Sequence, residues 1–201
     1  MEYILVGSLG FLSGYAFEVV SGKRLPGARP VLFAIASGLL LYSMVMVCLT
    51  SERFWLPTWA IVFGWILLPV SSLLFLRTLF FDLPFHGTYV TSLSESYLVT
   101  TGSYAIVRHP TVPLFLLILI SILLVSQASL VLLAIPIWGS LDILWAVLQE
   151  RLVLTKVFPD YKRYRESTPM LLPDRRTMGI FLNAFCIWKA PKGFSVWRSR
   201  V

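Results

Sequence analysis

Apolar residues along this chain form five long runs that are separated by short polar breaks, the pattern of helices that cross a membrane. A bilayer core of about 30 Å needs about 20 apolar residues in an α-helix. We predict spans over residues 3–20, 31–50, 54–76, 112–125 and 130–148. The fourth span is short. The pattern predicts an all-α integral membrane protein of a single domain with about five transmembrane helices.

The breaks between the runs predict how the spans are connected. Ser51, Glu52 and Arg53 form a tight connection, and residues 126–129 form a reversal that pairs the last two spans as an antiparallel hairpin. Two prolines of the third run, Pro57 and Pro69, are expected to kink the helix, which neighbouring helices can tolerate.

Four parts of the single membrane domain, residues 1–201, follow from these breaks. Residues 1–76 carry three spans, and residues 112–149 carry the hairpin. Residues 77–111 between them are too polar to span and too long for a plain turn, and loops of this length are often functional. After the hairpin, residues 150–201 are predicted to form an amphipathic helix up to Arg165 and then a cytosolic tail.

The distribution of charge predicts how the spans are oriented in the membrane. The net charge is +7, and 11 of the 17 Lys and Arg residues follow Glu150. With the amino terminus outside, five spans place 16 cations on the cytoplasmic side and Arg53 alone on the other. Cytoplasmic loops are enriched in Lys and Arg. We therefore expect a multi-pass protein with a cytoplasmic carboxy terminus and site, and the lipid bilayer rather than nucleic acid as partner.

The composition argues against several other classes of protein. Only 13% of the residues are charged, far below the quarter that is usual in soluble domains. Cys48 and Cys186 are too few for a disulfide framework or a cysteine-based zinc site, and we expect no metal. The chain begins Met-Glu and its first cations follow the first run, which favours a retained anchor over a cleaved signal.

The stretch over residues 98–110 carries the first candidate chemistry. It ends in Arg108, His109 and Pro110, at the mouth of the fourth span. Arg108 there would either extend to lipid phosphate, with His109 making local hydrogen bonds, or the two would bind an anionic ligand.

A second candidate stretch begins where the fifth span leaves the membrane. Glu150 at that point would pair with Arg151 or Arg108, or bind a ligand. Tyr161 and Tyr164 are three residues apart and so share a helix face, either as tyrosines of the membrane interface or as the wall of a site.

The two stretches together resemble the isoprenylcysteine carboxyl methyltransferases and the related phospholipid methyltransferases. Residues 98–110 resemble that family's Gly-Pro-Tyr-x-x-x-Arg-His-Pro signature. Residues 149–173 resemble its carboxy-terminal signature, a Glu-Glu pair followed by Tyr-x-x-Tyr and Thr-Pro-x-x-x-Pro. The resemblance covers about residues 98–173, and the first three spans match only as generic hydrophobic helices.

What the resemblance implies is an all-helical membrane enzyme that transfers a methyl group from S-adenosylmethionine to a lipid-like or prenylated acceptor. Arg108 and Glu150 would be catalytic, with Glu150 binding the amino group of the methionine moiety or placing the acceptor. The residues implied in cofactor binding are Tyr104, Val107, His109, Glu150, Tyr161 and Tyr164.

The chain departs from the family pattern at several positions. Ser103 replaces a proline, and Gln149 replaces the first glutamate of the pair. Val112 stands where the family has tyrosine, and Leu114 stands where it has glycine. These changes leave open a non-catalytic relative, and an NADPH enzyme resembling the sterol reductases is a further alternative.

Asp142 lies outside the resemblance, in the middle of the fifth span. It shares a helix face with Trp138, Trp145 and Gln149. A carboxylate within a membrane is costly and is by default a functional hypothesis. The alternative is a hydrogen bond to a neighbouring helix, for example to a serine of the third span.

Overall fold

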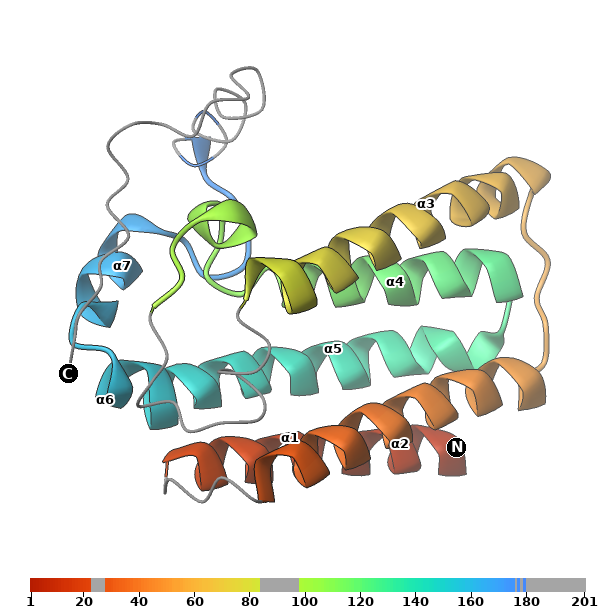
Figure 1. Cartoon of the computed structure of the whole chain (residues 1–201). Coiled ribbons are helices and arrows are strands. Elements are labelled where there is room, and N and C mark those ends of the chain that lie inside the picture. The colour runs from red at the N-terminus through yellow and green to blue at the C-terminus, as the bar shows by residue number, and fades with distance from the viewer. Residues whose placement is uncertain (23–27, 84–97, 176, 178, 180–201) are drawn as a thin grey trace.

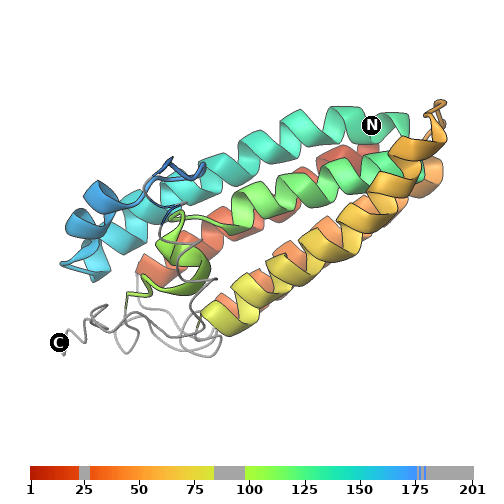
Figure 2. The same ribbon diagram turned by 90° about the horizontal axis from the view of Figure 1, so that it is seen from above.

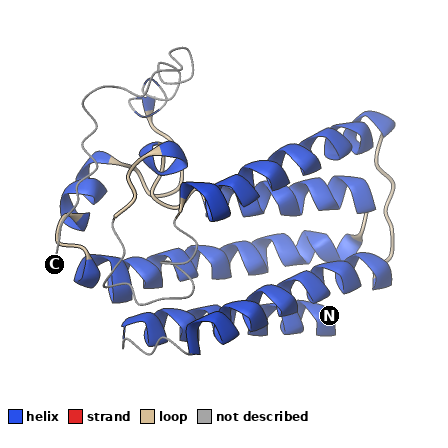
Figure 3. Cartoon of the chain, viewed as in Figure 1, coloured by secondary structure: helices blue, strands red, loops and turns tan. Residues whose placement is uncertain are grey.

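The chain forms a bundle of five antiparallel apolar helices, shown by a computed structural model that describes residues 1–22, 28–83, 98–175, 177 and 179 (Figure 1). The described residues contain no strand, only one isolated bridge between Arg53 and Ala128 (Figure 3). The five helices are α1 (Glu2–Gly22), α2 (Ala28–Thr50), α3 (Thr58–Arg77), α4 (Thr111–Ser126) and α5 (Ser129–Gln149). The all-α prediction is confirmed.

Four of these helices are long and apolar enough to cross a membrane: α1, α2, α3 and α5. The fifth, α4, has 16 residues and spans about 24 Å at 1.5 Å per residue, less than a bilayer core. Large apolar side chains cover the outside of the bundle, including Leu73 at 67% exposed and Trp65 at 60%. Such a surface is suited to lipid.

Contacts between consecutive helices, together with the contact between α1 and α5, hold the bundle together. Helix α1 packs against α2 and α5, and α4 packs against α3 and α5. The core between them contains Ile4, Phe11, Leu119, Val131 and Trp138, each 2% exposed or less. The core therefore lies where α1, α4 and α5 meet, and α3 is attached to it through α4.

The connection after α2 is longer than the sequence predicts. Helix α3 begins at Thr58 with Pro57 as its N-cap, so Pro57 precedes the helix and the prediction of a kink there is wrong. The Phe54 amide donates to the Gln127 carbonyl at 3.0 Å, and the Ser129 amide donates to the Glu52 carbonyl at 2.9 Å. These bonds hold the segment extended against the turn between α4 and α5.

The predicted hairpin of α4 and α5 is confirmed. The reversal is made by Gln127, whose φ of 57° is left-handed and whose amide donates to the Leu123 carbonyl at 2.9 Å. This is a common way for a helix to end.

After α5 the helix continues beyond the predicted end of the fifth span. It passes through a π-helical turn, η5 (Glu150–Leu154), and a final turn, α6 (Thr155–Val157). The chain then breaks at Phe158 and Pro159 and forms α7 (Tyr161–Ser167). One continuous helix up to Arg165 is therefore wrong, because proline lacks the amide that an uninterrupted helix needs. Most of the predicted tail, including Cys186, lies outside the described residues, as do residues 84–97 of the loop.

One end of the bundle gathers the segments that carry the candidate chemistry (Figure 2). The end of α1, the starts of α2 and α4, the end of α5 and α7 all lie there, whereas the amino terminus and the turn at Gln127 lie at the other end (Figure 1). The two termini of the helical bundle are therefore at opposite ends, as an odd number of antiparallel helices requires.

Close packing of α3 on α4 depends on Gly64. A Cβ atom there would lie 2.7 Å from Leu124 Cβ and 3.1 Å from Val125 Cγ2. We expect Gly64→Ala to lower the thermal midpoint in detergent, because overpacking costs about 1–3 kcal/mol. Gly38→Ala is the matched control, since its Cβ would meet no atom within 4 Å. Equal midpoints for the two variants would contradict the packing of α3 on α4.

Candidate functional site

Glu150 joins the two stretches that the sequence singles out. Its Oε1 atom lies 2.7 Å from Arg108 Nη1 and 3.0 Å from His109 Nε2. The three side chains are at most 9% exposed. Since a carboxylate oxygen accepts, His109 donates from Nε2. Of the two partners considered from sequence, Glu150 pairs with Arg108, and Arg165 approaches its other oxygen at 4.0 Å.

Backbone hydrogen bonds fix the Arg108–His109 pair against the carboxy-terminal stretch. The Arg108 amide donates to the Pro169 carbonyl at 2.9 Å, and the His109 amide donates to the Met170 carbonyl at 3.1 Å. Pro169 belongs to the Thr-Pro motif, so both motifs meet through the main chain as well as through Glu150. These bonds fix the position of the backbone from which the Arg108 and His109 side chains extend.

The turn before Arg108 is held by Asp82, the last residue of the π-helical turn η1 (Thr78–Asp82) that follows α3. This turn is the 3-10 helix η4 (Gly102–Ala105). The Ser103 amide donates to Asp82 Oδ2 at 3.1 Å, and Gly102 adopts a φ of 63°. A Cβ at Gly102 would lie 3.0 Å from the Asp82 carboxyl carbon. Position 102 therefore favours glycine both because of its backbone conformation and because Asp82 approaches it closely.

Tyr161 and Tyr164 cover the Arg108 side of the site. Their rings pack edge to face with centroids 5.9 Å apart, and the Tyr164 hydroxyl donates to the Tyr104 carbonyl at 2.6 Å. Burial raises the pKa of both phenols, and the negative charge of Glu150 raises the pKa of Tyr161 further. Both tyrosines are therefore neutral hydrogen-bond donors at physiological pH.

A cavity of about 490 Å³ opens beside these residues and runs between the helices. Five of the predicted site residues line it: Tyr104, His109, Tyr161 and Tyr164 of those predicted to bind the cofactor, and Arg108, which was predicted to be catalytic. Val107 is buried but is not in the cavity wall. Glu150 is also absent from the wall and lies behind Arg108 and His109.

The two departures from the family pattern have different surroundings. Val112 is 3% exposed and forms part of the cavity wall. Leu114 is half-buried and is not in the wall. Substitution at Val112 therefore bears on the shape of the cavity, whereas Leu114 does not reach it.

The cavity wall also contains two charged residues, Glu18 and Arg29, that the sequence analysis missed. Trp145 donates from Nε1 to Glu18 Oε1 at 2.9 Å, and Arg29 donates from Nε to the Ser21 hydroxyl at 3.1 Å. Both charged residues are 1% exposed, and the Arg29 guanidinium lies 5.2 Å from the centroid of Phe17. An acid within the apolar run 3–20 was the signal that would have identified Glu18.

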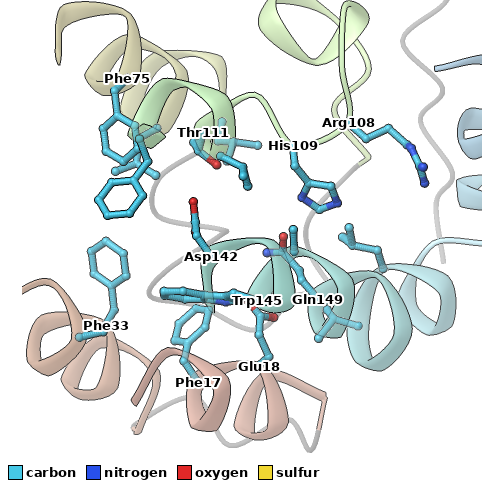
Figure 4. A pocket seen from close by; sticks show the side chains of 18 of the residues that line it. Phe17, Glu18, Phe33, Phe75, Arg108, His109, Thr111, Asp142, Trp145 and Gln149 are labelled. Carbon is cyan, nitrogen blue, oxygen red and sulfur yellow. The ribbon is translucent and has the colours of Figure 1, made fainter. Parts of the chain in front are cut away.

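Asp142 also lines the cavity, and its side chain points across it toward Thr111 (Figure 4). Its Oδ2 atom is buried and has no hydrogen-bond partner among the described residues. Trp145 and Gln149 share the cavity wall with it. Trp138, expected on the same face, is instead fully buried and donates to the Ile4 carbonyl at 3.1 Å. Within the described part of the chain, Asp142 makes no hydrogen bond to a serine of α3.

Among the described residues, no group of three or more His, Cys, Asp or Glu side chains is arranged to hold a metal ion. Comparisons with protein-family models, with curated proteins and with solved structures yield no match. The function must therefore be argued from the chemistry of the site itself.

Proposed function

We propose that this protein is a membrane methyltransferase that transfers a methyl group from S-adenosylmethionine to a lipid-like or prenylated acceptor. The observation that carries the proposal is the cavity of about 490 Å³ walled by Arg108, His109, Tyr161 and Tyr164, from both motif stretches. Its size is within the range of about 300–1,000 Å³ that is usual for small-molecule sites.

The polar end of the cavity fits the methionine part of this cofactor. Arg108 Nε is buried and makes no hydrogen bond to the described residues. A buried donor of this kind normally has a partner, and a planar guanidinium suits a carboxylate. The faces of Tyr161 and Tyr164 would attract a sulfonium, since aromatic rings attract cations by about 0.5–2 kcal/mol per contact.

Glu150 in this proposal is a positioning residue. Its Oε1 atom is shared by Arg108 and His109, and the carboxylate does not reach the cavity. The resemblance implied that Glu150 binds the amino group of methionine. Because its carboxylate lies outside the cavity wall, the proposal does not give Glu150 this role. Glu150 instead keeps Arg108 and His109 in place and balances the arginine charge.

The remaining requirement is alignment of a donor with an acceptor. Bound S-adenosylmethionine supplies a methyl group on sulfur, and its in-line transfer to a nucleophile leaves S-adenosylhomocysteine. Such a displacement depends on orientation more than on acid–base chemistry. The apolar walls beyond Thr111 exclude water and suit an acceptor with a hydrocarbon body.

We place this site on the cytoplasmic side of the membrane. Arg77, Arg151 and Lys156 belong to the end of the bundle that carries the site, whereas Arg53 belongs to the opposite end. Positive residues concentrate on the cytoplasmic side of membrane proteins. The cofactor would then enter from the cytosol.

Calorimetric titration of the purified protein in detergent with S-adenosylhomocysteine tests the proposal. We expect saturable one-to-one binding that Arg108→Lys weakens roughly tenfold, because lysine keeps the charge and loses the guanidinium fork. Arg151→Lys, at an exposed neighbour of Glu150, is the matched control and should bind like the wild type. Absence of binding in a folded wild type, or binding of NADPH instead, would overturn the proposal.

A further inference from the structure

The carboxylate of Asp142 is the one cavity-lining charge for which the described residues offer no compensation. Arg108 is paired with Glu150 at 2.7 Å. The charges of Glu18 and Arg29 stabilise each other. No described cation lies within 4.0 Å of Asp142.

Two hydrogen-bond donors near Asp142, those of Tyr15 and Trp145, are directed to other groups. The hydroxyl of Tyr15, which interacts electrostatically with Asp142, donates to the Leu141 carbonyl at 2.8 Å. Trp145, one turn along α5, donates to Glu18. Among the described residues, the buried Oδ2 atom of Asp142 has no hydrogen-bond partner. An unsatisfied carboxylate at this depth is energetically costly, so a ligand that supplies a hydrogen-bond donor would bind favourably to Asp142.

Around Asp142 the cavity is shaped for an apolar molecule. The cavity lining includes three phenylalanines from three helices, Phe33 of α2, Phe75 of α3 and Phe115 of α4, together with Ile118 and Ile122. Figure 4 shows Phe33 and Phe75 on the far side of Asp142 from Arg108. Asp142 thus stands between the polar end of the cavity and its hydrocarbon-like end.

We propose that this part of the cavity binds a cationic amphiphile, with an ammonium head on Asp142 and an apolar body among the phenylalanines. An ammonium group supplies both the missing charge and the missing hydrogen bond. The indole of Trp145, which also lines the cavity, offers an aromatic face to the same cation. An alcohol of equal length would supply the hydrogen bond without the charge.

The inference goes beyond methyl transfer, because the binding requires neither S-adenosylmethionine nor Arg108. It is therefore tested with no nucleoside present. The experiment measures saturable binding of radiolabelled decylamine to the protein in nanodiscs of neutral lipid, with empty nanodiscs subtracted and decanol as the uncharged probe.

We expect decylamine to bind one-to-one to the wild type, and Asp142→Asn to weaken it roughly tenfold. Asparagine keeps the shape and removes the charge, so decanol binding should be unchanged and would show that the cavity of the variant is intact. Glu18→Gln is the matched control, since it removes the other cavity carboxylate, which already has partners.

Three outcomes would overturn the inference. Equal binding of decylamine by the wild type and Asp142→Asn would mean that Asp142 does not recognise the head group. Equal affinity of the wild type for decylamine and decanol would mean that the cavity selects only an apolar body. Loss of binding in Glu18→Gln alone would assign the cation to Glu18.

Discussion

Glu150→Ala is expected to abolish measurable binding of S-adenosylhomocysteine and to lower the thermal midpoint by about 10 °C. Two side chains depend on this carboxylate, Arg108 at 2.7 Å and His109 at 3.0 Å, and both are nearly fully buried. Removing one partner of a buried ion pair leaves an uncompensated charge and costs about 3–5 kcal/mol. The guanidinium would then turn away from the cavity toward water.

A double variant separates the binding role of Glu150 from its contribution to stability. Replacing both Glu150 and Arg108 with leucine removes the charge together with its partner, and such replacements of buried pairs are often neutral or stabilising. We expect this variant to recover most of the thermal midpoint and none of the ligand binding. This double variant and the two corresponding single variants, Glu150→Leu and Arg108→Leu, form a cycle that measures the coupling of the two residues.

Calorimetry and thermal unfolding of the wild type, both single variants and the double variant give this cycle. Arg151→Ala is the control, because Arg151 is exposed and surface charges contribute little. Recovery of ligand binding in the double variant would show that Arg108 and Glu150 serve only stability. Full binding in Glu150→Ala would show that Arg108 holds its position without the carboxylate.

Trp138→Ala is expected to give the second largest loss, a decrease in stability of about 3 kcal/mol. The indole is 0% exposed in the core between α1 and α5, and its nitrogen donates to the Ile4 carbonyl at 3.1 Å. Helix α1 approaches so closely that a Cβ at Gly7 would lie 2.4 Å from the ring. Because helices in lipid associate mainly through packing, a void at this contact weakens the attachment of α1.

Thermal unfolding of Trp138→Ala beside Trp59→Ala measures this contribution. Trp59 is 73% exposed on α3, so its removal takes away the same side chain without opening a void in the core. We expect the Trp59 variant to keep a midpoint close to that of the wild type. Similar midpoints for the two variants would mean that the contact between α1 and α5 contributes little to stability.

The helical bundle follows from the sequence because each helix has to satisfy its own backbone hydrogen bonds in lipid. A run of apolar residues is enough to predict such a helix, and the five runs correspond to α1–α5. The predictions are wrong at the ends of helices, because contacts with other segments determine where a helix begins or ends. Residues 52–54 stay extended because the turn at Gln127 binds them, and no local pattern contains that partner.

The candidate site was partly predictable for a different reason. Arg108, His109, Tyr161 and Tyr164 are identified by the resemblance of their two stretches to the family signatures, and the structure brings them together around one cavity. Their pairing is a tertiary property. Sequence alone left Glu150 with two possible partners, and the fold selects Arg108 by placing the end of α5 beside the start of α4.

The sequence thus predicts the class of protein and its helices, because these depend on local composition and periodicity. It indicates the candidate site residues through the resemblance of two stretches to family signatures. Which of these residues share a cavity depends on the packing of the helices, and this is seen only in the tertiary structure. In the structure Glu150 and Val107 lie outside the cavity wall, contrary to expectation, whereas Glu18 and Arg29 are part of it. Within the part of the chain that the structure describes, the Asp142 Oδ2 atom has no hydrogen-bond partner. Burial and pairing are properties of several helices at once, and they exist only when those helices are packed together.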